Sequence, residues 1–367
     1  MMDSFVLRNV RTTDEKVIDL VIANNNIVEI APPNTGKADR IIDFNQTVYI
    51  SSGWIDLHVH AFPEFNPYGD EIDEIGYKLG VTTIVDAGST GADRIHDLYT
   101  YSKTAKTNVF AFLNISKIGL QRIDELSDLS WLNEEELLTT AKKYQDFIVG
   151  LKARISNSVV GENGLKPLEL ARKFSKSTKL PLMVHIGSGP PDISEVLKLL
   201  KEKDVITHYL HGKRNNLFNN FGEPLPCLLE ARKRGVHLDV GHGNASFSFR
   251  TAEDAKKYGI PFDTISTDIY RKNRLQGPVY SLADTLTKFL CLGYSLKDVI
   301  DAVTVNAATW LGRPALGRIA TGDLANLTLF SVEEKPIKLT DSEGIERFYN
   351  KQIEVKGVVI NGEFIEC

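Results

Sequence analysis

Short apolar runs alternate with amphipathic stretches along most of the chain. Apolar runs of strand length occur at Thr82–Asp86, Asn108–Asn114, Phe147–Lys152, Leu182–Ile186, Val205–His208, Val236–Val240 and Thr264–Thr267. Amphipathic stretches separate them, for example Glu134–Tyr144, Pro167–Ser175, Ser194–Leu200 and Leu225–Lys233. This strand–helix alternation predicts a parallel sheet whose strands are joined by crossover helices.

Both ends of the chain have a different pattern, with short strand-like runs joined by polar turns. At the N-terminal end the runs are Ser4–Asn9, Val17–Ala23, Asn26–Ile30 and Gln46–Ser51, and at the C-terminal end Asn326–Phe330, Ile353–Ile360 and Glu363–Ile365. We interpret the polar run Glu333–Asp341 as a solvated loop. The pattern predicts a small β-sandwich domain made of residues 1–52 and 314–367, beside a barrel made of residues 53–313.

Composition narrows the class of protein. A chain of 367 residues with 42% hydrophobic content can bury one large core and a smaller second one. A net charge of -5 gives no basic footprint for nucleic acid. The three cysteines share no close spacing, so neither a disulfide framework nor a thiolate metal site is indicated. Without a signal-peptide core or a long apolar run, we expect a soluble cytoplasmic protein with no membrane partner.

Side chains of metal-ligand type recur at the ends of the predicted strands. The series is His58, His60, Lys152, His185, His208 and Asp268. The intervals between its members fit three, one, one and two strand–helix units of about 25–35 residues each. The series would then fall at the ends of strands one, four, five, six and eight of a (β/α)8 TIM-like barrel. We therefore predict a metal centre on one rim of that barrel.

The first three members of the series also have a structural explanation. His58 and His60 share one face of a strand, where they could bind a metal or form a hydrogen-bonded core pair. Lys152 could extend to the surface, or it could be held neutral by burial and react with carbon dioxide to form a bridging carbamate. Arg154 shares the face of Lys152, where it could hold a substrate carboxylate or form a salt bridge. His96, in a predicted helix, and the strand residue His237 are expected to be structural.

Taken together, these motifs resemble the amidohydrolase superfamily, specifically its binuclear members with a carboxylated lysine. The resemblance runs over nearly the whole chain and rests on Gly53–His60, Val149–Arg154, Val184–Gly187, Thr207–Gly212, Asp239–Gly243 and Ile265–Asp268. The motifs also resemble a narrower bacterial branch described as dihydroorotase-like, adenine-deaminase-like, or amidohydrolase/deacetylase. Some members of that branch act on acylated small acids.

The resemblance implies a role for each ligand. His58, His60 and Asp268 would hold the more buried metal, and His185 and His208 the more exposed one. Carboxylated Lys152 and a hydroxide would bridge the two ions. Asp268 would take the proton of the nucleophile and deliver it to the leaving group. Zinc is the expected metal, although manganese, iron or cobalt would be held by the same set.

The leading hypothesis is a hydrolase that cleaves an amide or ester bond of a small, acylated, carboxylate-bearing molecule. Candidate substrate-binding residues are Arg154, His211, His242, Asn114, Tyr270, Arg271, Pro278 and Val279. The alternatives are a cyclic-amide hydrolase of the dihydroorotase or hydantoinase type, a purine (adenine) deaminase, and a metal-stabilised scaffold without catalysis. The expected partner is a small-molecule substrate, and a homo-oligomer is plausible by resemblance.

Overall fold

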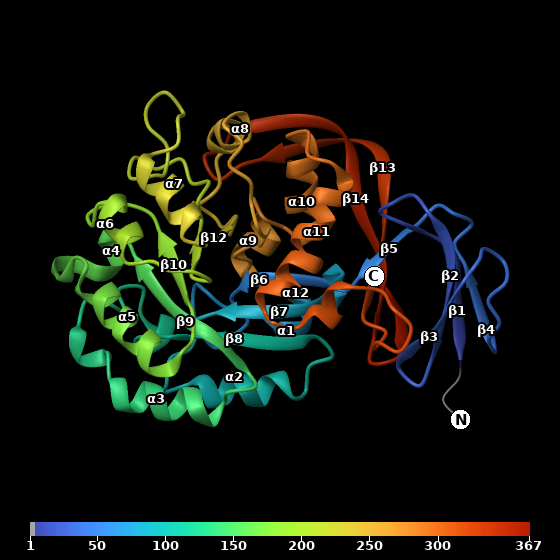
Figure 1. Ribbon diagram of the computed structural model, residues 1–367, viewed down its shortest axis with the longest axis horizontal. Helices are drawn as coiled ribbons and strands as arrows, with labels where there is room; N and C mark the ends of the chain where they lie inside the picture. The colour runs from blue at the N-terminus through green and yellow to red at the C-terminus, as the bar shows by residue number, and fades with distance from the viewer. Residues whose placement is uncertain (1–3) are drawn as a thin grey trace.

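Seven parallel strands, hydrogen-bonded in their chain order, form the sheet of the barrel in the computed structural model, which describes residues 4–367 (Figure 1). They are β6 (Trp54–Val59), β7 (Val81–Ala87), β8 (Asn108–Asn114), β9 (Ile148–Ile155), β10 (Leu182–Ile186), β11 (Val205–Thr207) and β12 (His237–Asp239). The parallel sheet predicted from the strand–helix alternation is thereby confirmed.

The eighth position of the barrel is filled by residues 264–269, which are not a regular strand. Thr264 pairs with β12 and Ile269 pairs with β6, each through an isolated parallel bridge. This segment therefore closes the ring between the last strand and the first. It departs from regular strand geometry because Asp268 adopts a left-handed backbone with φ 52°. The segment predicted as a strand at 264–267 thus occupies the expected position in the barrel, but it does not form a regular strand.

The helices of the barrel follow the amphipathic stretches. They are α1 (Ile72–Ile75), α2 (Ile95–Ser102), α3 (Glu134–Lys143), α4 (Asn157–Val160), α5 (Lys166–Thr178), α6 (Ile193–Lys198), α7 (Pro226–Lys233), α8 (Phe249–Lys257), α9 (Arg271–Gln276), α10 (Leu282–Cys291), α11 (Leu296–Ala302) and α12 (Val305–Trp310). Helix α3 shows why: the Asn133 side chain caps it, and Leu137 and Ala141 face the core. None of the helices within residues 4–367 is long and apolar enough to cross a membrane.

Strands from both chain ends form one mixed, eight-stranded sheet beside the barrel. They are β1 (Phe5–Thr12), β2 (Val17–Ala23), β3 (Asn26–Ala31), β4 (Arg40–Asp43), β5 (Tyr49–Ser52), β13 (Leu327–Thr340), β14 (Glu346–Ile360) and β15 (Glu363–Glu366). Leu7, Leu20, Ile22, Leu327 and Leu329 belong to an apolar cluster separate from that of the barrel. The predicted β unit built from both chain ends is thus present, and its strands belong to one hydrogen-bonded mixed sheet.

A long hairpin of β13 and β14 leaves this sheet and arches over the barrel to reach α8 (Figure 1). The prediction of a solvated loop at Glu333–Asp341 is therefore wrong, because most of this run lies in β13. Its middle residues are exposed, so the arm shows no alternation of apolar and polar positions. The tip of the hairpin, residues 341–345, lies against the segment between β12 and α8. At the start of α8, Asp341 accepts a hydrogen bond from Phe249 N.

Candidate metal centre and active site

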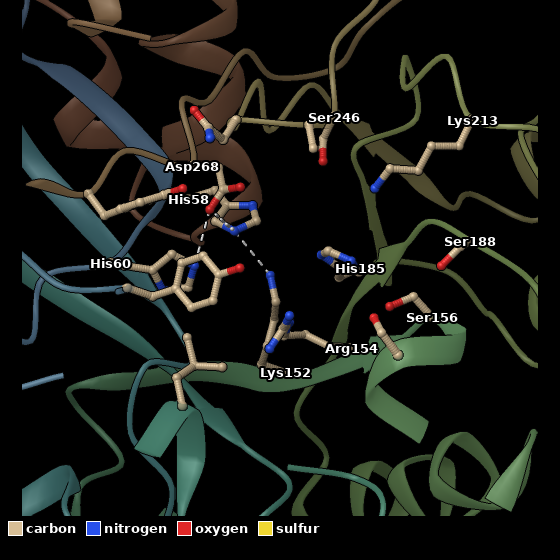
Figure 2. Close-up of a pocket in the computed structure, with 16 residues that line it drawn as sticks. His58, His60, Lys152, Arg154, Ser156, His185, Ser188, Lys213, Ser246 and Asp268 are labelled. Carbon is tan, nitrogen blue, oxygen red and sulfur yellow. Dashed lines mark hydrogen bonds and ion pairs between the residues drawn. The ribbon is translucent and has the colours of Figure 1, made fainter. Parts of the chain in front are cut away.

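His58 of the first barrel strand, His60 just beyond it and Asp268 of the closing segment meet at the carboxyl end of the barrel (Figure 2). His60 Nε2 lies 3.1 Å from Asp268 Oδ1, and His58 Nε2 lies 3.4 Å from the same oxygen. One ligand atom from each of the three residues lies within 4.8 Å of the others. Ligand atoms at tetrahedral positions around a zinc ion lie about 3.3 Å apart, so this spacing fits a shared cation.

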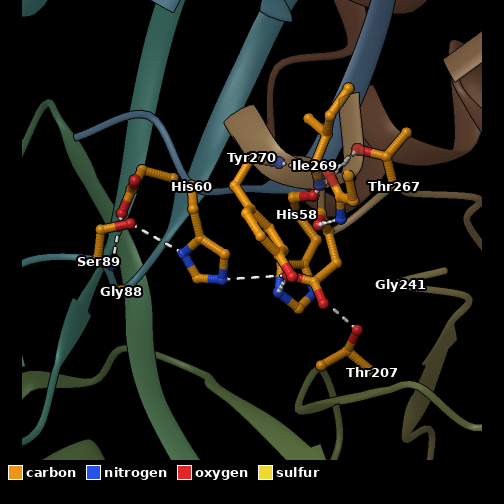
Figure 3. Close-up of polar contacts among 12 residues, drawn as sticks. His58, His60, Gly88, Ser89, Thr207, Gly241, Thr267, Ile269 and Tyr270 are labelled. Atoms are coloured by element: carbon orange, nitrogen blue, oxygen red, sulfur yellow. Dashed lines mark hydrogen bonds and ion pairs between the residues drawn. The ribbon is translucent and has the colours of Figure 1, made fainter. Parts of the chain in front are cut away.

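Hydrogen bonds behind the histidines orient their rings. His58 Nδ1 lies 2.8 Å from Thr207 Oγ1, and that hydroxyl donates to Asp239 Oδ2. The hydroxyl therefore accepts from His58 Nδ1–H, which leaves a lone pair on Nε2 facing Asp268. His60 Nδ1 contacts Ser89 Oγ at 2.8 Å (Figure 3), and its other ring nitrogen, Nε2, lies beside Asp268.

His185 and His208 bring two further imidazoles to the same end of the barrel. Their ring centroids lie 4.5 Å apart. His208 Nδ1 donates to the Gly241 carbonyl oxygen at 2.5 Å, so Nε2 carries the lone pair. That Nε2 is buried and has no hydrogen-bond partner among residues 4–367. A buried nitrogen left without a partner is costly, and a metal ion would satisfy it.

Lys152 ends inside this group of histidines. Its side chain is fully buried, with Nζ 3.3 Å from His58 Nε2 and 3.2 Å from Met183 Sδ. Gly88 makes room for it, since a Cβ at Gly88 would lie 2.5 Å from the Lys152 Cβ. Burial lowers the pKa of Lys152 to about 7, so much of it is the neutral amine near neutral pH. The neutral amine is the form that reacts with carbon dioxide.

Burial also sets the charge states of the other groups. It lowers the pKa of His58 and of His185 well below the ordinary value, and that of His208 to about 3. Burial opposes ionisation of Asp268, but the hydrogen bond from His60 and the nearby His208 outweigh it and lower its pKa. Neutral imidazoles and an ionised carboxylate are the forms that bind divalent metals. The donor set therefore fits a metal centre.

A cavity of about 180 Å³ is lined by every member of the metal-ligand series except His208, which packs against His185. Of the predicted substrate residues, Arg154 and Tyr270 line this cavity. Arg154 is paired there with buried Glu125, whose oxygens lie 3.0 and 3.3 Å from its Nη1. The salt bridge considered for Arg154 thus exists, and it compensates the charge of this residue.

The other predicted substrate residues lie away from the cavity wall. Asn114 is buried and donates to the Gly88 carbonyl behind Lys152, and Val279 is buried in the core. Arg271 forms salt bridges with Asp70 and Glu71. Pro278 accepts a hydrogen bond from Lys288 through its carbonyl oxygen.

His211 and His242 are fully buried beside the site. His242 Nε2 accepts from Lys288 Nζ at 2.7 Å, so it holds the loop after β12 onto α10. His211 Nδ1 accepts from the Lys213 backbone N–H at 3.1 Å. The two predicted structural histidines lie elsewhere, with His96 bonded to Tyr144 and His237 to Thr264.

Several residues that the sequence did not single out line the cavity. They are Tyr68, Leu120, Lys213, Asn244, Ala245 and the serines Ser156, Ser158, Ser188 and Ser246. All of the serines stand in segments that follow barrel strands, the place where such barrels build their sites. That rule could have identified the segments, but not which side chains turn inward.

Comparison with known proteins agrees with this geometry. The sequence profile described as "Amidohydrolase family" matches residues 49–365. The chain belongs to the amidohydrolase family. Within this family it is 40% identical to a protein named "Deacetylase" from Enterococcus faecalis, over 98% of both chains. A "Deacetylase" from Brucella anthropi is 35% identical over 91% of this chain and 83% of that protein.

Solved structures of similar proteins share the whole fold. A crystal structure described as that of an adenine deaminase has a TM-score of 0.96 and 39% identity, and covers 100% of both chains. A crystal structure described as that of a dihydroorotase has a TM-score of 0.92 and 32% identity, and covers 99% of both. The relatives agree on a hydrolase of the amidohydrolase family, and the protein is such an enzyme. Their names differ in the substrate.

Proposed function

We propose that this amidohydrolase is a metal-dependent hydrolase that cleaves an amide or ester bond of a small, acylated, carboxylate-bearing molecule. The observation that carries the proposal is the convergence of three histidines, Asp268 and Lys152 on a small cavity with two cationic side chains on its wall. A fourth histidine, His208, packs against His185. The deacetylase names of the relatives support the same class of bond.

The ligand set would hold two divalent ions. His58, His60 and Asp268 would hold one ion, His185 and His208 the other, and carboxylated Lys152 would bridge them. Zinc suits a site rich in imidazole, although other first-row metals fit the same donors. When bound, such ions supply hydroxide near neutral pH and polarise a carbonyl group.

The residues of the chain perform the proton transfer and the positioning. The carboxylate of Asp268 borders the cavity, where it can accept the proton of the attacking water and return it to the leaving nitrogen or oxygen. Its lowered pKa keeps it ionised and ready to accept that proton. The small volume of the cavity admits an acyl group and a short acid rather than a polymer.

Two other classes of substrate are alternatives to an acylated acid. A cyclic amide would meet the same metal ligands, and the similarity to a structure described as a dihydroorotase supports its inclusion. Adenine is included because another similar structure is described as an adenine deaminase. A neutral purine makes no use of the cations Arg154 and Lys213, and for this reason we place it behind an acylated acid.

The test begins with the metal content of protein purified without chelators, followed by a panel of substrates. The panel contains N-acyl amino acids, acylated hydroxy acids, cyclic ureides and adenine. We expect two equivalents of metal per chain and turnover of at least one acylated acid. Robust release of ammonia from adenine, without turnover of any acylated acid, would refute the proposed substrate class.

A further inference from the structure

One cation on the cavity wall has no counter-ion in the protein. The amino group of Lys213 points toward the cavity (Figure 2) and forms no hydrogen bond or ion pair with any residue from 4 to 367. Arg154, the other cation, is compensated by Glu125. Lys213 is half-buried, and a charge removed from water without a partner is costly. An anion that enters the cavity would supply the missing partner.

The space in front of Lys213 is kept open by a glycine. A Cβ at Gly187 would lie 3.5 Å from Lys213 Nζ, 3.6 Å from His185 Nε2 and 3.4 Å from the Cβ of Ser156. The lysine amino group and the imidazole of His185 therefore border one small space. The hydrogen atom of Gly187 leaves that space free for a ligand.

The turn that carries Lys213 is fixed to the metal-ligand series. The Lys213 backbone N–H donates to His211 Nδ1, and the His211 backbone N–H donates to the His208 carbonyl oxygen at 3.1 Å. His211 is fully buried, so this turn has little freedom. His211 thus positions Lys213 at a set place relative to His208.

We infer that Lys213, Ser156 and the space left by the absent side chain of Gly187 form an anion subsite. This subsite binds the carboxylate of the substrate. This inference rests on the proposed function and adds where the acid group binds. Since the space borders both Lys213 and His185, the carboxylate must stand close to the acylated atom. Acids with a short spacer are therefore preferred to acids with a long flexible one.

The test compares each acid with its neutral counterpart on the metal-loaded enzyme. N-acetylglycine, N-acetylalanine and O-acetyl-lactate are assayed beside their carboxamides, and N-acetyl-6-aminohexanoate serves as the long-spacer acid. The variants are Lys213→Met, Lys213→Arg and Gly187→Ala, with the exposed Lys198→Met as the matched control. A methyl group at Gly187 meets only ordinary contacts, so this variant folds while narrowing the subsite.

We expect kcat/KM for the short acids to fall about 10- to 100-fold in Lys213→Met, the range of a hydrogen bond to a charged group. The carboxamides should be unaffected, Lys213→Arg should restore most of the activity, and Gly187→Ala should raise KM for the acids. An equal loss for acids and carboxamides, or no loss for either, overturns the subsite while the hydrolase proposal stands.

If no acid is hydrolysed, the proposed function fails, and the anion subsite is then tested by measuring ligand binding. Calorimetry then compares N-acetylglycine with N-acetylglycinamide on the wild type, Lys213→Met and Lys198→Met. Binding of the acid alone that is lost only in Lys213→Met supports the subsite. Binding that Lys213→Met leaves unchanged, or binding of neither compound, overturns it.

Discussion

Replacing Gly243 with alanine tests the structural basis of the site without replacing a proposed metal ligand. Gly243 has φ 54°, and a Cβ there would lie well inside van der Waals contact with Asp268 Oδ2. A left-handed backbone costs a residue with a Cβ about 1–2 kcal/mol, and overpacking adds about 1–3 kcal/mol if nothing moves. Asp268 has a short side chain that can turn away. Much of the second cost should therefore appear as a displaced carboxylate rather than as lost stability.

Gly259→Ala is the matched control, because Gly259 has φ 66° and no heavy atom near its Cβ position. Urea titrations should show both variants losing about 1–2 kcal/mol of the free energy of unfolding to the backbone conformation. Only Gly243→Ala should lose metal and show a fall of about 100-fold in kcat/KM, as expected for a misplaced reacting group. A Gly243→Ala enzyme with the metal content and turnover of Gly259→Ala would contradict this reasoning.

Four further predictions follow from particular contacts. Lys152→Ala should reduce the metal content from two equivalents per chain to one or none, whereas two equivalents in this variant would argue against the bridge. Chelation should abolish turnover but leave the far-UV circular dichroism unchanged, because protein hydrogen bonds hold the ligands; loss of helical signal would show that the metal holds the fold instead. Burial lowers the pKa of Lys288 to about 7 from 10.5, so between these values the unfolded chain binds more protons than the folded protein. The stability of the wild type relative to Lys288→Met should therefore rise with pH from 7 to 10.5, by about 1.4 kcal/mol per pH unit, and parallel curves in urea would be inconsistent with it. Ser342→Ala removes a 2.9 Å hydrogen bond from the hairpin tip to the Gly243 carbonyl and should speed amide hydrogen exchange in residues 242–249, by about fivefold for about 1 kcal/mol.

The architecture could be predicted from the sequence because the apolar pattern has a period. Runs such as Leu182–Ile186 match a barrel strand at both ends, and Glu134–Tyr144 matches helix α3 within one residue. The spacing of the metal-ligand series works for the same reason. Each strand–helix unit has a similar length, so residues at strand ends return to one rim of the barrel.

Residues whose position depends on the path of a loop could not be predicted. Lys213 follows a buried turn and lies within a loop, and no periodic signal shows that its amino group returns to the cavity. Ser342 lies at the tip of the hairpin of β13 and β14, about a hundred residues away in the chain from the loop that it contacts. Such contacts join distant segments, and the local pattern of apolar and polar residues does not encode them.

The backbone at two of the proposed ligands explains why the site is held by the barrel itself. His208 and Asp268 both have left-handed backbones, with φ 70° and 52°, immediately beyond the last regular strand residue or within the closing segment. Each such conformation costs a non-glycine residue about 1–3 kcal/mol and persists only where neighbouring contacts determine it. Those contacts are present: Asn273 Nδ2 donates to the Asp268 carbonyl oxygen at 2.9 Å, and the Asp268 N–H donates to the His58 carbonyl oxygen at 2.7 Å. Both side chains contact other members of the metal-ligand series: His208 packs against His185, and Asp268 lies beside His58 and His60. The ligand geometry is therefore built by hydrogen bonds of the protein, which prepares the site for a metal.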